Sequence, residues 1–328
     1  MTLIIYSDKF LLHDNPAHVE NASRAIAIIE LLKKMPFYEK LNFVEPDEAS
    51  EEEIKKVHDA NMVERAKKIG WLDMDTYTNE FSYEVAKLAA GGAIKACDEI
   101  IKGRDKNAFA VVRPPGHHAT RRASMGFCIF NNVAIAANWL TERGKKVLIF
   151  DHDVHHGNGT QDIFYERADV LYQSIHLYPH YPGTGRIEEI GGGEGEGYTV
   201  NAPLPYGSNE ECVRQIMDEI MLPVAEQFSP DFVLISAGFD SHHADPLGGL
   251  ALGLNFYGEI IDKFKNIQSR IVCILEGGYV INNIAKGTAI EVSHLQGEPI
   301  SFEEYSGGKN CREIVREIKK LIGNYWNL

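Results

Sequence analysis

The sequence predicts an α/β fold in which a single central, mostly parallel sheet carries helices on both faces. Three observations lead to this prediction. From residue 108 onward, short apolar runs alternate with helical segments, an order typical of βαβ units. Runs such as 147–149 lack polar alternation, which indicates strands that are buried on both faces. Acids and histidines directly follow several runs, at the edge where open α/β sheets bind ligands.

The bulk composition is consistent with one large, acidic domain. The 328 residues are 44% hydrophobic, and a chain of about 300 residues buries roughly 75% of its unfolded surface. No Pro/Gly/Ser-rich linker divides the chain, so we expect a single domain over residues 1–328. The formal charge of −14 provides no cationic excess for phosphates, which predicts no nucleic-acid partner. That charge serves either a cationic substrate or solubility.

The cysteines and the N-terminus predict a cytoplasmic protein. Five cysteines are an odd number without CxxC spacing, which favours free thiols in a reducing compartment over a disulfide framework. Residues 1–12 include Asp8 and Lys9 and no cationic leader, so they do not form a signal peptide. No apolar run elsewhere reaches the length of a membrane span, and we expect no membrane partner.

Start and stop signals place the individual elements. Ser50 followed by Glu53 is a capping box that predicts a short helix, and Gly103 is expected to end a long one. Strands are expected at 3–6, 108–112, 146–151, 169–177, 198–203, 231–236 and 270–275. Helices are expected at 23–34, 82–102, 131–143, 158–166, 209–227, 255–266 and 281–293, and loops at 10–21 and 71–81.

The strand at 146–151 runs into the first candidate metal ligands. In extended backbone the side chains of Asp151, Asp153 and His155 project to one side, because side chains alternate with period two. Acids and histidines this dense beside an apolar strand are costly unless the charges are paired or bound to a cation. We interpret Asp153 and His155 as ligands of a divalent metal, for which Zn²⁺ is the best fit to carboxylate and imidazole donors.

Three further strand ends carry chemistry. Asp240 follows the strand at 231–236 and would be a third ligand, leaving the open position of a catalytic zinc site; its alternative role is to cap a turn. His117 and His118 follow two prolines and a glycine that hold them on rigid backbone. Tyr279 follows paired glycines at the end of the strand at 270–275.

Together these groups form the inventory for metal-assisted amide hydrolysis. The metal polarises the carbonyl group and acidifies a bound water. A histidine takes the proton of that water and later protonates the departing amine, while a phenol stabilises the oxyanion.

The chain contains, in order, the runs RPPGHH (113–118), GFCIFNN (126–132), DHDVHHGNGTQ (151–161), PGTG (182–185), AGFDSHHADPLGG (237–249) and LEGGY (275–279). This collinear set resembles the zinc-dependent histone deacetylase superfamily, which includes acetylpolyamine amidohydrolases and acetoin-utilisation deacetylases. The resemblance implies an arginase/deacetylase fold with a central eight-stranded parallel sheet. It also implies removal of an acetyl group from a primary amine, either a small acetylated amine or an acetyl-lysine protein.

The resemblance also implies residue roles. His118 is the general base and acid, and His117 assists it electrostatically. Asp151 orients His117, while Asn158 lies behind His118 in a place where other members have Asp. A neutral partner leaves His118 less basic. The remaining roles fall to Asp153, His155 and Asp240 as ligands of Zn²⁺ and to Tyr279 as the group that polarises the carbonyl.

An acyl tunnel and a second ion follow from the same matching. Phe127 and Tyr181 form the tunnel walls, with Gly126 and Leu247 near its floor and rim. The resemblance implies K⁺ as a structural ion on backbone oxygens around residues 151–155, with Ser174 nearby. Arg24 either lies beneath the active site or is an ordinary arginine on a helix surface. Asp73 and Asp75 either meet a substrate amine or are solvated loop charges.

Two other functions remain open at this point. A binuclear manganese ureohydrolase shares the fold, but it would need an Asp two residues after Asp240, where His242 stands. A non-catalytic acetyl-lysine binding protein would keep the pocket and lose turnover. The substrate, the acyl-chain length and the oligomeric state are not determined by the sequence.

Overall fold

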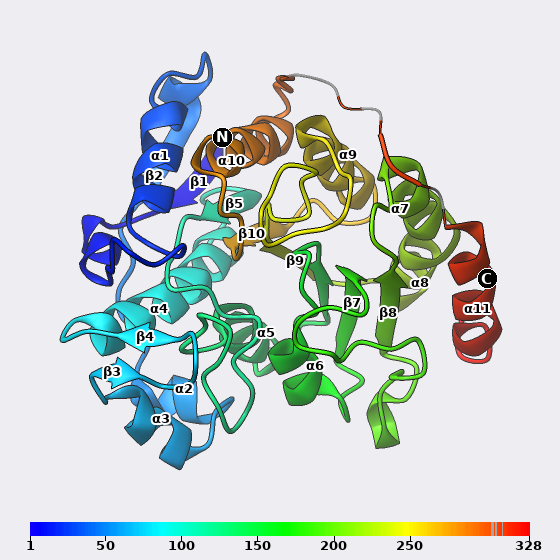
Figure 1. Ribbon diagram of the computed structural model, residues 1–328, viewed down its shortest axis with the longest axis horizontal. Coiled ribbons are helices and arrows are strands. Elements are labelled where there is room, and N and C mark those ends of the chain that lie inside the picture. The colour runs from blue at the N-terminus through cyan, green and yellow to red at the C-terminus, as the bar shows by residue number, and fades with distance from the viewer. Residues whose placement is uncertain (303–304, 306, 310) are drawn as a thin grey trace.

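The structure is a computed structural model that describes residues 1–302, 305, 307–309 and 311–328. Eight strands form one parallel sheet in the order β2-β1-β5-β10-β9-β6-β7-β8 (Figure 1). Their bounds are β1 (Thr2–Ile5), β2 (Leu41–Val44), β5 (Asn107–Ala110), β6 (Val147–Asp151), β7 (Val170–Leu177), β8 (Thr199–Leu204), β9 (Phe232–Ala237) and β10 (Ile271–Leu275). The predicted fold class is confirmed.

Helices cover both faces of the sheet (Figure 1). One face packs against α1 (Ser23–Leu32), α7 (Glu210–Ile216), α8 (Leu222–Phe228), α9 (Leu254–Lys265), α10 (Ile281–Gln296) and α11 (Arg312–Ile322). The other packs against α2 (Glu51–Lys55), α3 (Ala60–Ala66), α4 (Ser82–Ile101), α5 (Asn132–Thr141) and α6 (Asn158–Phe164). Short turns are η1 (Asp8–Leu12), η2 (Tyr38–Lys40), η3 (Gly193–Gly195) and η4 (Met217–Met221). None of the helices in the described part of the chain combines the length and apolar character that crossing a bilayer requires.

Alternate residues of each central strand enter two separate cores. In β6, Leu148 and Phe150 join the core under α9, where the Phe150 and Phe264 rings lie 4.7 Å apart, while Val147 and Ile149 join the opposite core. All four strand residues are fully buried. Each such burial stabilises the fold by about 1.5–3 kcal/mol, so both faces need apolar side chains and the strand appears in the sequence as an unbroken apolar run.

One element missing from the sequence prediction is the strand β2. β2 lies at the edge of the sheet and pairs only with β1, and its residues are partly exposed. Because an edge strand needs no continuous apolar run, residues 41–44 carry no clear strand signal. Helices α3 and α11 and the small β3 (Gly70–Trp71) and β4 (Tyr77–Thr78) hairpin within the loop at 71–81 were also not predicted.

The single helix predicted at 209–227 is interrupted in the structure by one π-helical turn. The π-helical turn η4 separates α7 from α8, which has Pro223 in its first turn. Proline has no N–H to continue the regular α-helical pattern, and this accounts for the interruption at that place. The capping box predicted for Ser50 and Glu53 is present, with Glu53 N–H donating to Ser50 Oγ at 3.2 Å.

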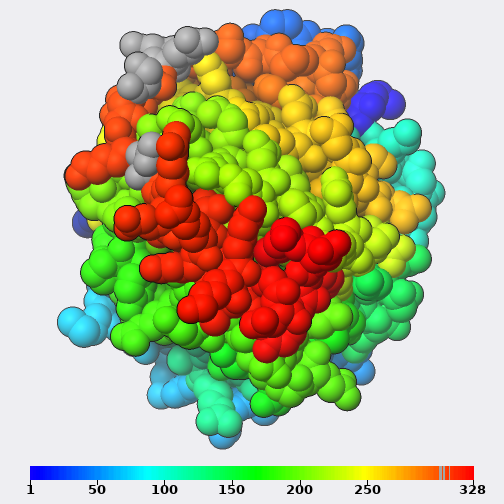
Figure 2. All heavy atoms as spheres, turned by 90° about the vertical axis from the view of Figure 1, so that its right-hand side faces the viewer, coloured from blue at the N-terminus to red at the C-terminus, as the bar shows by residue number. Residues whose placement is uncertain are grey.

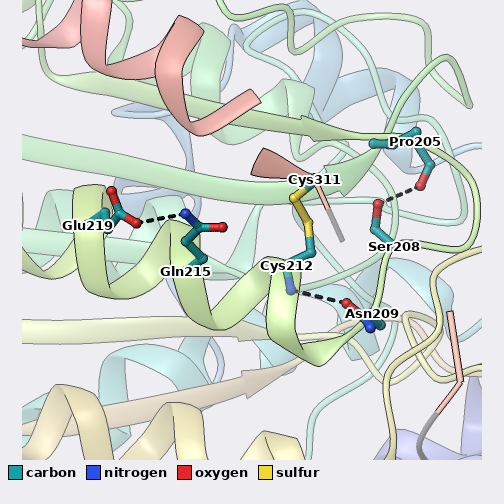
Figure 3. Close-up of a disulfide and its surroundings, with 7 residues drawn as sticks. All are labelled: Pro205, Ser208, Asn209, Cys212, Gln215, Glu219 and Cys311. Atoms are coloured by element: carbon teal, nitrogen blue, oxygen red, sulfur yellow. Dashed lines mark hydrogen bonds between the residues drawn. A yellow bond between two sulfur atoms is a disulfide. The ribbon is translucent and has the colours of Figure 1, made fainter. Parts of the chain in front are cut away.

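The prediction of free cysteines is wrong for two of the five. Cys212 in α7 and Cys311, directly before α11, form a disulfide (Figure 3), while Cys97, Cys128 and Cys273 are free and buried. Their sequence separation of 99 residues hides this pairing from any spacing rule, yet their Cα atoms lie 5.2 Å apart. The bond fastens the C-terminal segment, which lies across the yellow-green part of the surface in Figure 2, to the sheet-covering helices.

We predict that the disulfide stabilises the domain. Replacing Cys311 by Ser should lower the free energy of unfolding by about 2–4 kcal/mol, because the bond closes a long loop in the unfolded chain. Urea unfolding of wild type and C311S, each with and without a reducing agent, measures the effect. C311S and C212S should match each other and reduced wild type; equal stability of oxidised wild type and both variants would contradict the prediction.

Candidate functional site

Four neighbouring strands at the centre of the sheet, β5, β10, β9 and β6, carry the candidate site at their carboxyl ends. Parallel strands end at the same edge, so residues far apart in the chain meet there. The predicted residues follow these strands as His117 and His118 after β5, Tyr279 after β10, Asp240 after β9, and Asp153 and His155 after β6.

The three predicted metal ligands converge. Ligand atoms of Asp153, His155 and Asp240 all lie within 4.8 Å of one another. His155 Nδ1 is 3.0 Å from Asp153 Oδ1 and 3.3 Å from Asp240 Oδ2. Both carboxylates are fully buried and His155 is partly buried. Two carboxylates and one imidazole at this spacing are a donor set for a divalent ion such as Zn²⁺.

One buried oxygen of this cluster lacks a hydrogen bond. Asp153 Oδ2 accepts from Gly277 N–H and Asp240 Oδ1 accepts from Val154 N–H, each at 2.8 Å. Within the described residues, Asp240 Oδ2 accepts no hydrogen bond and has only the ion-pair contact with His155. An unsatisfied buried carboxylate oxygen is costly, and a bound cation would satisfy it. The donors therefore fit a divalent metal.

Two glycines let the backbone approach the carboxylates. A Cβ at Gly277 would lie 2.1 Å from Asp240 Oδ2, and a Cβ at Gly238 would lie 2.1 Å from Asp153 Oδ2. Any larger residue at either position would displace a candidate ligand.

The histidine pair is oriented by two different partners. His117 Nδ1 lies 3.1 Å from Asp151 Oδ2, and His118 Nδ1 lies 2.8 Å from Asn158 Oδ1. Both partner oxygens accept, so each Nδ1 carries the hydrogen, and Nε2 of a neutral His118 is left as a proton acceptor. The two rings lie 4.0 Å apart.

The surroundings of the two histidines also shift their pKa values in opposite directions. Burial opposes the charged form of His117, but the carboxylates of Asp153 and Asp151 outweigh it and raise its pKa to about 10. Burial and the charges of His117 and His155 hold the pKa of His118 well below its ordinary value. His118 is thus neutral near pH 7 and able to accept a proton. A cation on Asp153 would reduce the difference, because it would neutralise that carboxylate.

Tyr279 is held as a phenol in a fixed loop. Burial keeps the pKa of Tyr279 well above its ordinary value, so the hydroxyl remains a donor at neutral pH. Its backbone N–H donates to Asp245 Oδ2 at 2.7 Å. Arg24 lies over the ring at 5.1 Å and donates from Nε to Gly278 O at 2.8 Å. Arg24 is fully buried, which rules out a role as a surface arginine.

A cavity of about 320 Å³ opens onto these groups. The rings of Phe127 and Tyr181 face its interior, since Phe127 meets Tyr279 edge-on at 5.7 Å and Tyr181 meets His118 edge-on at 5.1 Å. A Cβ at Gly126 would lie 2.5 Å from the His118 ring. The lining includes the predicted Gly126, Phe127, Tyr181 and Leu247, and also Asp75, Cys128 and His180.

Sequence reasoning missed the residues that hold the catalytic loops in place. The Glu276 carboxylate accepts the N–H groups of Gly116 at 2.7 Å and His117 at 3.1 Å. The buried Glu20 carboxylate accepts from Arg113 Nε at 2.8 Å and from Arg24 at 3.1 Å. The available signal was an acid or arginine directly beside a predicted site run, as Glu276 is beside the paired glycines.

Comparisons with known proteins agree with this geometry. A family model described as "Histone deacetylase domain" matches residues 18–295. The chain belongs to the histone deacetylase family. It is 41% identical to a probable deacetylase of Archaeoglobus fulgidus and 39% identical to one of Methanothermobacter thermautotrophicus, each over 99% of both chains. Rice "Histone deacetylase 10, chloroplastic" is 35% identical over 94% of this chain and 77% of its own.

A solved structure supports the same assignment. The crystal structure of the HDA15 HD domain superposes with a TM-score of 0.92 at 35% identity, covering 99% of this chain and 97% of that one. The arginase/deacetylase fold expected from the resemblance is therefore confirmed. As a member of the histone deacetylase family, the chain is a deacetylase, an enzyme that hydrolyses acetyl-amide bonds.

We predict that zinc stabilises the protein more at neutral than at acidic pH. Burial and the charge of Asp153 raise the pKa of Asp240 to about 6. At about pH 7.5 this carboxylate is ionised, whereas at about pH 5.5 it must release a proton to bind metal. The gain in Tm on adding zinc to chelator-treated protein should therefore fall as pH drops. Asp240→Asn should show little gain at either pH; an equal wild-type gain at both would contradict the prediction.

Proposed function

We propose that the protein is a zinc-dependent amidohydrolase that removes an acetyl or short acyl group from a primary amine such as acetyl-lysine or an acetylpolyamine. The observation that carries this proposal is the buried group of Asp153, His155 and Asp240, whose donor atoms lie within 4.8 Å of one another beside two oriented histidines and a phenol. We further propose that residues 1–328 act as one catalytic domain, since one sheet takes its strands from Thr2 to Leu275 and the C-terminal helix α11 contacts β8.

Each residue has a distinct task in this proposal. Asp153, His155 and Asp240 would hold the zinc ion, which when bound polarises a carbonyl and acidifies water. His118 accepts a proton at Nε2 and returns it to the departing amine, and Asn158 fixes the ring for that transfer. The Tyr279 hydroxyl donates to the carbonyl oxygen as negative charge develops. His117, held by Asp151, provides positive charge beside it.

The tunnel residues would select the substrate. Phe127 and Tyr181 present flat faces to an extended acyl-amine chain, while Gly126 leaves room beside His118. Leu247 lies at the same cavity and provides apolar contact. Asp75 adds a carboxylate to the lining, which favours a substrate that carries positive charge or N–H donors.

We also propose a structural potassium ion and a cytoplasmic location. The first is based on the family resemblance and the second on the sequence. A structural K⁺ beside Asp151 comes from the family resemblance, and Asp151 pairs with Ser174 in the register of β6 and β7 as that site requires. A cytoplasmic location stays a prediction. The disulfide removes part of its basis, because such bonds are rare in reducing compartments.

The binuclear ureohydrolase is less consistent with the geometry. His242 Nδ1 accepts from Ala244 N–H at 3.2 Å and contacts the Asn283 amide at 3.0 Å, so that atom is engaged outside the metal cluster. A second candidate group, His117, Cys128 and Glu276, is also engaged, because Glu276 accepts two backbone N–H groups and His117 pairs with Asp151. Metal analysis of purified protein should give about one divalent ion per chain rather than two.

We predict that Tyr279→Phe separates turnover from binding. The variant keeps the ring that packs against Phe127 and loses only the donor, so kcat should fall by about 10²–10³ while ligand affinity changes little. Acetyl-lysine peptides, acetylpolyamines and longer acyl-lysines, assayed side by side with wild type, measure the effect and identify the substrate class. If zinc-loaded wild type cleaves none of them, the proposed substrate class is wrong, and the alternative of a non-catalytic acetyl-lysine binding protein gains support.

We also predict that Asn158→Asp moves the acidic limb of the pH profile of kcat/KM. A carboxylate behind His118 favours its charged form and raises its pKa, so the neutral base appears only at higher pH. The limb should shift toward alkaline pH by about one unit or more. Asn158→Ala removes the partner without adding charge and serves as the control; an unchanged limb in Asn158→Asp would exclude His118 as the base.

A further inference from the structure

A second cavity lies on the outer side of the loop that carries Asp240. It has a volume of about 300 Å³, and among the described residues its lining has cationic, amide and aromatic side chains but no carboxylate. This composition is unusual for a chain with a formal charge of −14. The lining consists of His242, His243, Ala244, Leu254, Asn282, Asn283, Lys286 and Tyr305.

His242 lines this cavity and carries a donor without a partner among the described residues. Its side chain is nearly buried, with 5% exposure, and its Nδ1 atom must accept because the Ala244 backbone N–H can only donate. The ring hydrogen therefore lies on Nε2. Within the described residues that Nε2–H group has no hydrogen-bond partner, so it remains available to a ligand in the cavity that His242 lines.

Lys286 provides the positive charge. It projects from α10 into the cavity lining, and its Nζ atom lies 5.2 Å from the centre of the Phe302 ring. In the part of the chain that the structure describes, no carboxylate oxygen lies within ion-pair distance of this ammonium group. Among the described residues, an acceptor that enters the cavity would therefore meet a cation without an ion-pair partner.

The first turn of α10 adds further donors. Val280 precedes the helix without a side-chain cap. Asn283 and Ile284 donate to Val280 O, and among the described residues the N–H groups of Ile281 and Asn282 have no hydrogen-bond acceptor. The Asp245 carboxylate, which holds the segment before this helix, accepts the N–H groups of Tyr279 and Val280 at 2.7 and 3.3 Å. The rings of His243 and Tyr305 stack with their centres 3.7 Å apart, and both residues line the cavity.

We propose that this cavity is a binding site for the phosphate group of a small soluble metabolite. A tetrahedral oxyanion accepts from several directions at once, which matches an ammonium group, an imidazole N–H, a side-chain amide and a helix start that converge on one space. A planar monoanion such as acetate would use fewer of these donors. The site is separate from the tunnel, and binding there does not depend on the deacetylase proposal.

Inorganic phosphate, titrated into zinc-loaded full-length protein by calorimetry at constant ionic strength, tests the proposal. Lys286→Met should weaken binding at least about tenfold, because it removes a charge-assisted contact. His242→Phe, which keeps the ring volume, should weaken it several-fold. Lys34→Met removes the same charge from the exposed turn that follows α1 and should bind like wild type.

Further measurements identify the class of ligand and the location of the binding site. Sulfate should bind comparably to phosphate and acetate much more weakly; equal binding of acetate would overturn the assignment to a tetrahedral oxyanion. Phosphate binding that is absent in wild type, or unchanged in Lys286→Met, would overturn the site itself, the latter placing phosphate at the metal. Deacetylase turnover of Lys286→Met should equal that of wild type, which keeps this test distinct from the proposed catalytic function.

Discussion

Two carboxylates buried beside one imidazole impose the constraint on which the rest of the site depends. Ligand atoms of Asp153 and Asp240 lie within 4.8 Å of each other, so their charges repel by at least about 3.5 kcal/mol at an effective dielectric constant of about 20. Burial adds a desolvation cost to each. The chain meets part of this cost with the N–H groups of Gly277 and Val154, and a divalent cation would meet the remainder.

The same constraint explains why two adjacent histidines behave differently. His117 lies against the negative cluster, 3.8 Å from Asp153 as well as 3.1 Å from Asp151, and so is held charged. That charge, with His155, then disfavours a second cation on His118, whose own partner is the neutral Asn158. Two adjacent histidines thus have different charges: His117 is a fixed positive charge and His118 is a neutral base. General acid–base catalysis needs such a neutral base to accept the proton.

How much the sequence predicts follows from what each residue does. Buried strands require apolar side chains on both faces, so strands such as β6, β9 and β10 are visible as apolar runs, whereas the half-exposed edge strand β2 is not. The candidate metal ligands and the catalytic histidines can be recognised in the sequence because their function depends directly on their residue type. Asp245 and Glu276 act by accepting backbone N–H groups, a demand set by loop geometry that no residue pattern states. The Cys212–Cys311 bond depends on the docking of α11, which is equally invisible at a separation of 99 residues.

Glu276 connects the separate strand ends into one rigid unit. Its carboxylate holds the turn before the histidine pair through Gly116 and His117, and Arg24 donates to its backbone carbonyl. The next residue, Gly277, donates to the candidate ligand Asp153, and Tyr279 follows two residues later. A shift of this short segment would therefore move the base, the metal ligand and the phenol together rather than one at a time. Because catalysis is sensitive to small errors in relative position, fixing all three groups to one strand end preserves their mutual geometry even when the surrounding loops move.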